Sequence, residues 1–291
     1  MKIHFCGVGK MGLPMAGHLA AAGHELTVSD PSSERLALAR QQGLTVVEDE
    51  RQAMAKSHVV FSSLPNDGAL RAVAAVLAGA ARPGTTYVDT STVSPQASAQ
   101  VAGILEAQGI VYVRTAVSGN NKMAEAAQLT VLASGPRAGY DRMLPLLERL
   151  GPNQFYLGDV EQARLMKLVV NLMIAQTSAM LAEALTLGRK GGLDWQAMWQ
   201  VLTASAVASP ILKAKSVQLA QRDFTPTFTV EQMIKDLDLI LGAGSAVDVP
   251  LAQTAMTRRL MQEALTRGLG QEDYAAILKV LEQDARLPGT P

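Results

Sequence analysis

The sequence predicts an α/β protein in which an N-terminal, doubly wound parallel sheet is followed by an all-α domain. Strand-like and helix-like segments alternate through about residue 157, with short glycine-bearing turns between them. Beyond that point no convincing strand pattern follows. A helical pattern from about residue 158 to residues 188–192 connects the two parts. We therefore expect one domain over residues 1–160 and a second over residues 161–291.

The elements of the first domain follow from apolar runs and from glycines that end helical patterns. The expected strands cover residues 2–6, 25–29, 45–47, 58–64, 85–91, 110–113 and 129–134. The expected helices cover residues 11–22, 34–42, 52–55, 69–78 and 96–108. In the second domain Asp194 should cap a helix that is broken at Ser209 and Pro210. Residues 223–228 should form a loop, and helical patterns resume at Val230 and Pro250.

Composition excludes several classes of protein. The chain has 291 residues, 48% of them hydrophobic, and 26 basic side chains balance 26 acidic ones. A disordered chain would be less apolar, and a nucleic-acid-binding protein would carry a basic excess. A small-molecule ligand is therefore the expected partner, and nucleic acid is not.

The expected location is the cytoplasm, without a membrane span. Cys6 is the single cysteine, so the chain cannot form an internal disulfide or a multi-thiolate metal site. The glycine motif begins too early to leave room for a signal peptide. The most apolar stretch, residues 165–187, is interrupted by polar and charged side chains, which favours a buried core helix over a membrane span.

A glycine motif indicates a dinucleotide site of the Rossmann type. Gly7, Gly9 and Gly12 stand where the first strand gives way to a helix, a position that suits a tight turn, close approach to a pyrophosphate and close helix packing. The anion would lie at the helix N-terminus. The residues between the glycines should line the cofactor as well: Val8, Lys10 and Met11.

Asp30 ends the second strand and predicts which dinucleotide is preferred. Its carboxylate can accept hydrogen bonds from a ribose and would repel a 2′-phosphate, so NAD is favoured. NADP stays possible because Arg35 could approach a phosphate. The alternative interpretation is that Asp30 caps the following helix together with the two serines after it.

Lys167 is the candidate acid/base. Its ammonium lies among apolar residues, so it must reach water or be held in a polar site. Asn171 is one helical turn further on and faces the same way. Beside a nicotinamide, Lys167 could donate a proton to a carbonyl oxygen and Asn171 could orient the substrate. The alternative is a lysine that extends from the helix edge to solvent.

Several segments, in this order, match one known family. They are GVGKMGLPMAGHL (7–19), SLPN (63–66), DTSTVSP (89–95), VSG (117–119), GDVEQARLMKLVVN (158–171) and MIKDL (233–237). Over essentially its whole length the chain resembles the β-hydroxyacid dehydrogenases, which include 3-hydroxyisobutyrate dehydrogenase and tartronate semialdehyde reductase.

The resemblance implies an NAD(P)-dependent oxidoreductase that acts on a small hydroxy acid or its semialdehyde. It implies that Lys167 is the general acid/base and that Ser118, Gly119 and Asn171 contact the substrate. The cofactor would be lined by Leu64, Pro65, Thr92 and Lys235. It also implies a homodimer or homotetramer. For Lys235 the alternative is an ordinary helix lysine paired with a neighbour.

The substrate segment departs from the family pattern. Members usually read DAPVSGG, whereas this chain reads RTAVSGN over residues 114–120. Arg114 could add positive potential for an extra anionic group, or it could point outward from the strand end. Asn120 replaces a glycine and should reshape the pocket, so we also place it among the substrate-binding residues.

Two other functions stay open. The related imine reductases share the fold and the cofactor but usually lack a lysine at the position of Lys167. A noncatalytic dinucleotide-binding module is the second alternative. The four histidines show no metal-ligand spacing with carboxylates, so no metal is expected.

Overall fold

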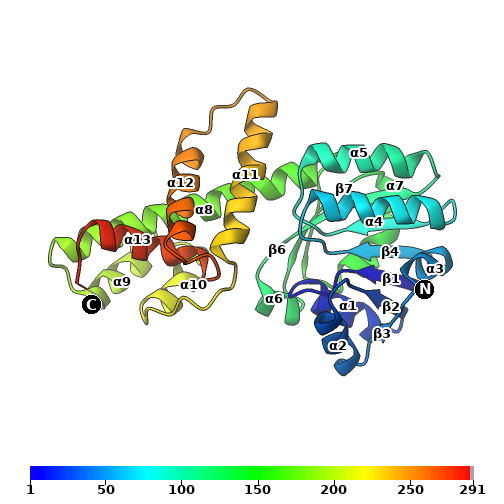
Figure 1. The fold of residues 1–291 in the computed structure, drawn as a ribbon, viewed down its shortest axis with the longest axis horizontal. Coiled ribbons are helices and arrows are strands. Elements are labelled where there is room, and N and C mark those ends of the chain that lie inside the picture. Colours follow the sequence, from blue (N-terminus) through cyan, green and yellow to red (C-terminus); the bar gives the residue numbers. More distant parts are fainter. Residues whose placement is uncertain (289–291) are drawn as a thin grey trace. The chain divides into compact units, whose positions relative to one another are not determined.

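The computed structural model describes residues 1–288, which form two units, Met1–Lys167 and the chain from Leu168 onward. The first unit is an α/β sandwich and the second is helical (Figure 1). The described chain contains 13 α-helices, distributed over both units. The strands are β1 (Lys2–Cys6), β2 (Glu25–Ser29), β3 (Thr45–Val46), β4 (Val59–Ser62), β5 (Thr86–Asp89), β6 (Val111–Ser118), β7 (Thr130–Ser134) and β8 (Asn153–Tyr156).

The helices of the first unit alternate with these strands. They are α1 (Gly12–Ala21), α2 (Ser33–Gln41), α3 (Glu50–Lys56), α4 (Asp67–Ala80), α5 (Pro95–Glu106), α6 (Asn121–Glu125) and α7 (Arg137–Leu147). Side chains cap most of them in the expected way: Ser32, Asp49, Asn66 and Ser94 each accept a hydrogen bond from a backbone N–H in the first turn.

The strands form one sheet in the order β3-β2-β1-β4-β5-β6-β7-β8. From β3 to β6 all neighbours are parallel, so the chain runs outward from β1 to β3 and then returns to the other side of β1 with β4. This reversal makes the carboxyl ends of β1 and β4 the topological switch point of the sheet, the place at which open α/β sheets bind ligands.

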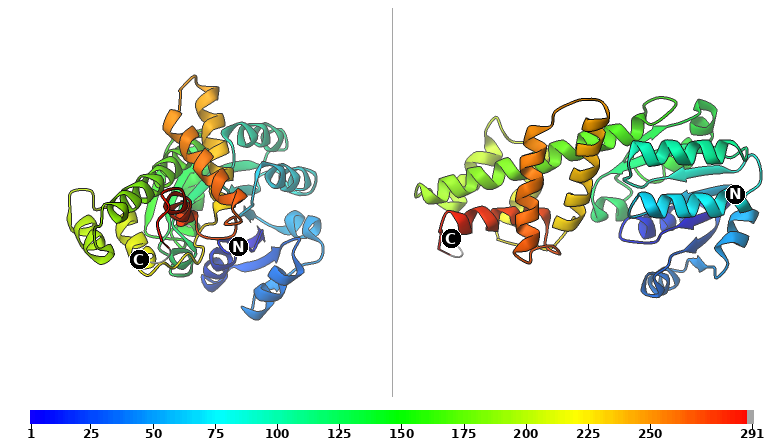
Figure 2. Two further views of the ribbon diagram at one scale, coloured as in Figure 1. Left: turned by 60° about the vertical axis from the view of Figure 1, so that its left-hand side comes forward. Right: turned by 45° about the horizontal axis from the view of Figure 1, so that its top comes forward.

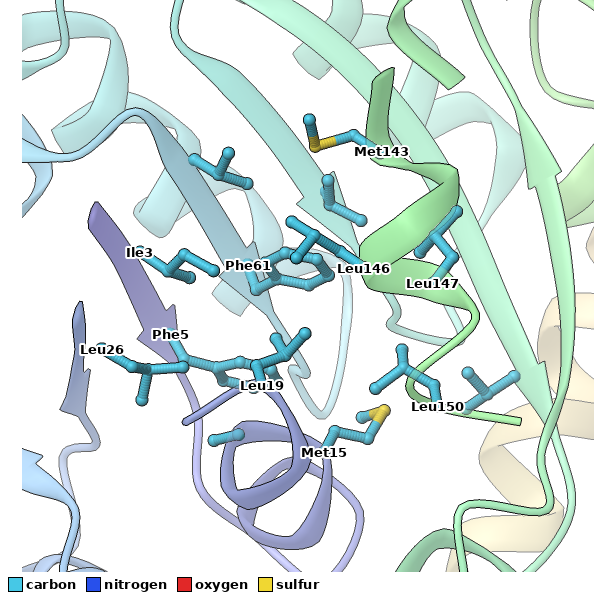
Figure 3. Packing of buried hydrophobic residues seen from close by; sticks show 14 of the residues in the cluster. Ile3, Phe5, Met15, Leu19, Leu26, Phe61, Met143, Leu146, Leu147 and Leu150 are labelled. Carbon is cyan, nitrogen blue, oxygen red and sulfur yellow. The ribbon is translucent and has the colours of Figure 1, made fainter. Parts of the chain in front are cut away.

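Alternation along β1 assigns side chains to the two faces of the sheet. Ile3 and Phe5 pack with α1 and α7, and the ring of Phe5 stacks on Phe61 with 5.8 Å between centroids (Figure 3). Cys6 faces the opposite side, where it joins apolar residues of α3, α4 and α5. Both faces are therefore covered, as a mostly parallel sheet requires.

The far side of the sheet differs from expectation. β6 continues to Ser118, five residues beyond the expected end at residue 113. β7 runs antiparallel to β6, because the short connection through α6 returns the chain directly instead of crossing over. β8 was not expected, since its half-exposed, polar sequence pairs only at the sheet edge beside β7.

The second unit begins within a long helix. α8 (Gln162–Lys190) is unbroken, and α9 (Trp195–Ala204) starts at Asp194, which caps it as expected. The remaining elements are α10 (Pro210–Leu219), α11 (Val230–Ala246), α12 (Ala252–Thr266), the 3₁₀ turn η1 (Tyr274–Ala276) and α13 (Ile277–Asp284). α11 and α12 lie side by side (Figure 2). By length and composition α8 could cross a membrane, but a buried core helix meets the same criterion.

His4 is a buried polar residue on the α3 face of β1. Its ring nitrogens lie 3.0 Å from Thr27 Oγ1 and 3.1 Å from Ser29 Oγ. Burial lowers the pKa of His4 to about 4 from an ordinary value of 6.5, with a smaller opposing effect from Thr27. The imidazole is therefore neutral in the folded protein at neutral pH.

This depressed pKa predicts acid destabilisation. In the unfolded chain His4 becomes protonated below about pH 6.5, whereas in the folded protein it becomes protonated only near pH 4. Between these two pH values the unfolded state binds the extra proton, so the free energy of unfolding falls as the pH drops through this window. The loss of unfolding free energy is about 3 kcal/mol at most, from the size of the shift. Urea unfolding at pH 7 and pH 5 measures it. In His4→Gln the difference between the two pH values should shrink, and an unchanged difference would assign the loss to other groups.

Candidate active site

Five segments with predicted site residues meet at one edge of the sheet. Gly7 follows β1, Asp30 follows β2, Leu64 follows β4, Thr92 follows β5, and Ser118 ends β6. Because these strands are parallel neighbours, their carboxyl ends lie at the same edge. The structure therefore brings together residues that lie more than one hundred positions apart in the chain.

Two of the three motif glycines are required by the fold itself. Gly7 has φ +88°, and a Cβ built there would lie 2.4 Å from the carbonyl oxygen of Ser63. A Cβ on Gly12 would lie 1.9 Å from the carbonyl oxygen of Gly7. At Gly9 an added Cβ would meet nothing within 4 Å in the described chain. The fold does not explain Gly9, whose open surroundings suit the approach of a ligand to the backbone.

The N-terminus of α1 suits an anion. Among residues 1–288, no side chain hydrogen-bonds the first turn of α1 from its N-cap, Met11. The neighbouring helices α2 and α4 are capped by Ser32 and Asn66 instead. Backbone N–H groups at a helix start, with the positive end of the helix dipole, bind phosphate well. The loop and this helix start therefore fit the pyrophosphate of a dinucleotide.

Asp30 connects the end of β2 to the glycine loop. Its Oδ2 accepts a hydrogen bond from the N–H of Val8 at 2.9 Å, and its Oδ1 accepts one from the N–H of Ser32 at 2.9 Å. The helix cap itself is Ser32, whose Oγ accepts from the N–H of Arg35 at 3.3 Å. The carboxylate is thereby fixed in position, half-buried beside the loop.

The segments after β4 and β5 are hydrogen-bonded to each other. The N–H of Leu64 donates to Ser91 Oγ at 2.8 Å, and Thr90 Oγ1 donates to the carbonyl oxygen of Ser62 at 2.7 Å. Leu64 and Thr92 are half-buried and Pro65 is exposed. This arrangement keeps the three predicted cofactor residues at one surface of the first unit.

The substrate loop follows β6. Gly119 has φ +140°, and a Cβ there would lie 2.7 Å from Leu129 Cδ2, so the loop needs glycine at this position. Asn120 caps α6, since its Oδ1 accepts a hydrogen bond from the N–H of Met123 at 3.0 Å. Its side-chain oxygen therefore has a structural task that the sequence did not reveal. Ser118, at the strand end, is half-buried.

Lys167 and Asn171 are both buried on α8, with exposed fractions of 9% and 6%. In the second unit, Asn171 Nδ2 donates to Asp236 Oδ2 at 2.5 Å. Lys235 Nζ lies 2.7 Å from the other oxygen of Asp236. Asp236 is thus a site candidate that sequence reasoning overlooked, although it stands inside the matched segment at residues 233–237.

Arg114 takes neither of its two expected roles. It is 6% exposed, its Nε donates to Glu161 Oε1 at 2.7 Å, and its guanidinium lies 4.7 Å from the ring centre of Tyr112. The side chain therefore does not point outward into solvent. Because the ion pair with Glu161 is largely buried, Arg114 links β6 to the residue before α8 instead of presenting its charge to a ligand.

A buried arginine was also overlooked. Arg164, one turn before Lys167, is 1% exposed and pairs with Asp89 at the end of β5. Burial opposes its charge, but Tyr112 and Asp89 outweigh that effect, so the pKa of Arg164 is raised. The signal in the sequence was an arginine in an otherwise apolar helical pattern, which requires a buried partner.

One group of possible metal ligands comes together away from these segments. Ligand atoms of His4, Cys6 and Glu50 lie within 4.8 Å of one another. Both ring nitrogens of His4 already have hydroxyl partners. Burial, with Glu50 as a smaller cause, raises the pKa of the Cys6 thiol well above its usual value, so the thiol keeps its proton at neutral pH. We assign the group as a hydrogen-bonded polar cluster and place no metal there.

Comparison with known proteins identifies the family. Residues 2–158 match the "NAD binding domain of 6-phosphogluconate dehydrogenase", and residues 162–281 match the "NAD-binding of NADP-dependent 3-hydroxyisobutyrate dehydrogenase". The chain is 36% identical over 287 residues to 2-(hydroxymethyl)glutarate dehydrogenase of Eubacterium barkeri, covering 97% of this chain and 95% of that protein.

One more relative and one solved structure are similar to the chain over nearly its whole length. Glyoxylate/succinic semialdehyde reductase 2 of Arabidopsis thaliana is 30% identical to this chain. The alignment covers 97% of this chain and 80% of that protein. A solved structure of 3-hydroxyisobutyrate dehydrogenase from Mycobacterium tuberculosis with L-serine superposes with a TM-score of 0.89 at 27% identity, covering 96% of this chain and 98% of that one. With a two-part fold and a nicotinamide-dinucleotide domain of this kind over its first half, the chain belongs to the β-hydroxyacid dehydrogenase family of NAD(P)-dependent oxidoreductases.

Proposed function

We propose that this enzyme transfers a hydride between a nicotinamide dinucleotide and a small β-hydroxy acid or its semialdehyde, with Lys167 as the general acid/base. The observation that carries the proposal is the burial of Lys167, 9% exposed, in the part of α8 that belongs to the first unit. That unit also holds the glycine loop and Ser118. A buried amine in a dinucleotide-binding unit suits proton transfer at a substrate oxygen.

The chain's own residues divide the remaining work. A nicotinamide dinucleotide held at the glycine loop would supply the hydride donor or acceptor. During oxidation the neutral amine of Lys167 takes the hydroxyl proton, and during reduction its ammonium form returns a proton to the carbonyl oxygen. Ser118 and the backbone of Gly119 hold the substrate carboxylate by hydrogen bonds, and Asn171 orients the reacting end. Asp236 holds Asn171 in place through its hydrogen bond.

The substrate class is supported by the relatives. One relative is named for 2-(hydroxymethyl)glutarate, a β-hydroxy acid with a second carboxylate, and another is named for glyoxylate and succinic semialdehyde. These are small acids or acid aldehydes. Because Arg114 is paired with Glu161, we do not assign it to a second carboxylate.

We propose NAD as the preferred dinucleotide. The support is Asp30, whose carboxylate is fixed beside the glycine loop by the N–H groups of Val8 and Ser32. A fixed negative charge at this position accepts hydrogen bonds from ribose hydroxyls and disfavours a 2′-phosphate.

An imine-reducing enzyme and a noncatalytic module are the alternatives. Titration with NADH, followed by a panel of semialdehydes, hydroxy acids and cyclic imines, separates them. Turnover of cyclic imines alone would favour an imine-reducing enzyme. Binding of NADH without turnover of any compound would favour a noncatalytic module.

Replacing Lys167 by Ala should lower kcat at least about 100-fold, because general acid/base catalysis contributes on the order of 10²–10⁴. The dissociation constant for NADH should stay within about twofold, since the lysine acts at the substrate and not at the phosphates. Steady-state kinetics and fluorescence titration measure the two quantities.

The matched control is Lys213→Ala, which removes an exposed lysine of α10. Its kcat should equal that of the wild type. A Lys167→Ala enzyme with near wild-type kcat on the same substrate would overturn the proposed role.

Replacing Gly9 by Ala should leave thermal stability unchanged, because the added methyl group meets nothing in the described chain. NADH binding should weaken at least about tenfold, or roughly 1.4 kcal/mol, since the methyl group occupies the space through which the pyrophosphate approaches the backbone. Thermal unfolding and fluorescence titration separate the two effects.

Two other glycines of the same segment serve as controls. Gly17→Ala also meets open space, so NADH binding should be unchanged. Gly12→Ala overlaps the carbonyl oxygen of Gly7 and should destabilise the fold itself. Equal NADH affinity for Gly9→Ala and Gly17→Ala would argue against a phosphate at the loop.

Replacing Asp30 by Asn should shift preference from NADH toward NADPH. The change removes the negative charge and keeps one of the two acceptor oxygens that hold Val8 and Ser32. The ratio of kcat/KM for NADPH to that for NADH should rise about tenfold, equivalent to roughly 1.4 kcal/mol. If the ratio stays the same in a variant of wild-type stability, Asp30 does not select the cofactor.

A further inference from the structure

Arg164 is a fully hydrogen-bonded side chain of the first unit. A guanidinium has five N–H donors, and in Arg164 every one has an acceptor. Nε donates to Ser98 Oγ at 3.3 Å. Nη1 donates to the carbonyl oxygens of Ser91 and Thr115 at 2.8 and 2.7 Å. Nη2 donates to Asp89 Oδ2 and, at 2.9 Å, to Tyr112 Oη.

These acceptors belong to the parts of the sheet that carry the site. Asp89 ends β5 and Ser91 directly precedes Thr92, the predicted cofactor residue. Thr115 lies on β6, three residues before Ser118. Asp89 Oδ1 also accepts hydrogen bonds from Ser62 Oγ and Ser91 Oγ, at 2.6 and 2.5 Å. One guanidinium thus joins α8 to the strand ends from which the cofactor and substrate segments begin.

Within the first unit, apolar packing alone does not fix the rotation of α8; Leu168, the next residue after Lys167, is 2% exposed but packs in the core of the second unit. Leu165, Met166 and Val169 are 47%, 40% and 47% exposed, so these apolar side chains, which lie within little more than one turn, make few core contacts. The buried positions before Lys167 are Ala163, a small residue, and Arg164. Directional hydrogen bonds from Arg164 therefore supply the orientation that side-chain packing leaves open.

Two more contacts hold the start of the helix but do not reach Lys167. Ser134 Oγ of β7 accepts a hydrogen bond from the N–H of Ala163 at 3.2 Å, and Arg114 pairs with Glu161. Both lie at or before the first turn. Of these three polar contacts between α8 and the sheet, that of Arg164 lies closest to Lys167, three residues or about 4.5 Å along the helix axis.

We infer that Arg164 is a positioning residue for Lys167: its five hydrogen bonds set the height and rotation of α8 relative to the cofactor segment after β5 and the substrate segment after β6. This inference rests on the proposed role of Lys167. Arg164 itself touches no substrate, and it acts only by placing the amine. Displacement of a catalytic group by about 1 Å costs on the order of 100-fold in rate, so a small rotation of the helix is sufficient to matter.

Arg164→Lys is the variant that tests this role. Lysine keeps the buried positive charge opposite Asp89 but has three donors on one nitrogen, so it cannot serve acceptors on both β5 and β6 with the geometry of a guanidinium. We expect kcat to fall between about tenfold and 100-fold. The dissociation constant for NADH should stay within about twofold, and the limb of the kcat–pH profile that depends on Lys167 should move.

The matched control is Arg189→Lys. Arg189 stands near the other end of α8, and it is similarly buried, with a side chain 6% exposed and paired with Glu282. This variant should lose comparable thermal stability but keep kcat and the pH profile of the wild type. If both variants lower kcat to the same extent, or if Arg164→Lys keeps wild-type kcat and pH profile, the positioning role is overturned.

A double variant covers the case in which Arg164→Lys does not fold. Asp89→Asn with Arg164→Gln removes both buried charges together, which avoids an unpaired ion in the core. Gln has too few donors to replace the contacts to Ser91 and Thr115, so kcat should remain at least about tenfold low. Wild-type kcat in this folded double variant would refute the inference.

The outcomes separate the inference from the proposed function. Loss of kcat in Lys167→Ala together with full kcat in Arg164→Lys would reject the positioning role alone. Full kcat in Lys167→Ala would reject the proposed function, on which the inference rests.

Discussion

The buried ion pair between Arg164 and Asp89 is the interaction on which the arrangement of the site depends. Both side chains are almost completely excluded from water, and an unpaired charge in either place would cost about 3–5 kcal/mol. The pair is stable because all the guanidinium donors are satisfied, and Asp89 is also held by Ser62 and Ser91. It joins the sheet to the helix that carries the candidate acid/base.

The topology of the sheet determines where the glycine loop and the segments after the strands lie. β1 has parallel neighbours on both sides, and the chain changes direction between β3 and β4. The glycine loop therefore lies at the switch point between β1 and β4. Gly7 and Gly12 permit the chain to turn there without steric overlap, and Gly9 leaves the backbone accessible. Within one motif, Gly7 and Gly12 are therefore required by the fold, whereas Gly9 suits the binding of a ligand.

Sequence reasoning succeeded where a signal is local. The strand, glycine loop and helix at residues 2–22, the cap at Asp194 and the long helix α8 all depend on neighbouring residues. It was wrong about the direction of β7 and missed β8, because strand direction and edge pairing are properties of the whole sheet. For Arg114 the sequence left open a charge that serves a ligand and a side chain that points outward, but not a buried ion pair, since nothing nearby in the sequence indicates Glu161, 47 residues away.

The sequence by itself determined the order of elements, the dinucleotide motif and membership of the family, because these are encoded by periodicity and short motifs. Only the tertiary structure decided which polar side chains are partners. Arg164 and Asp89 are 75 residues apart, and Asn171 and Asp236 are 65 apart. Such pairs form when separate strands and helices come into register, and the cost of leaving a buried charge or amide unpaired then selects the partner.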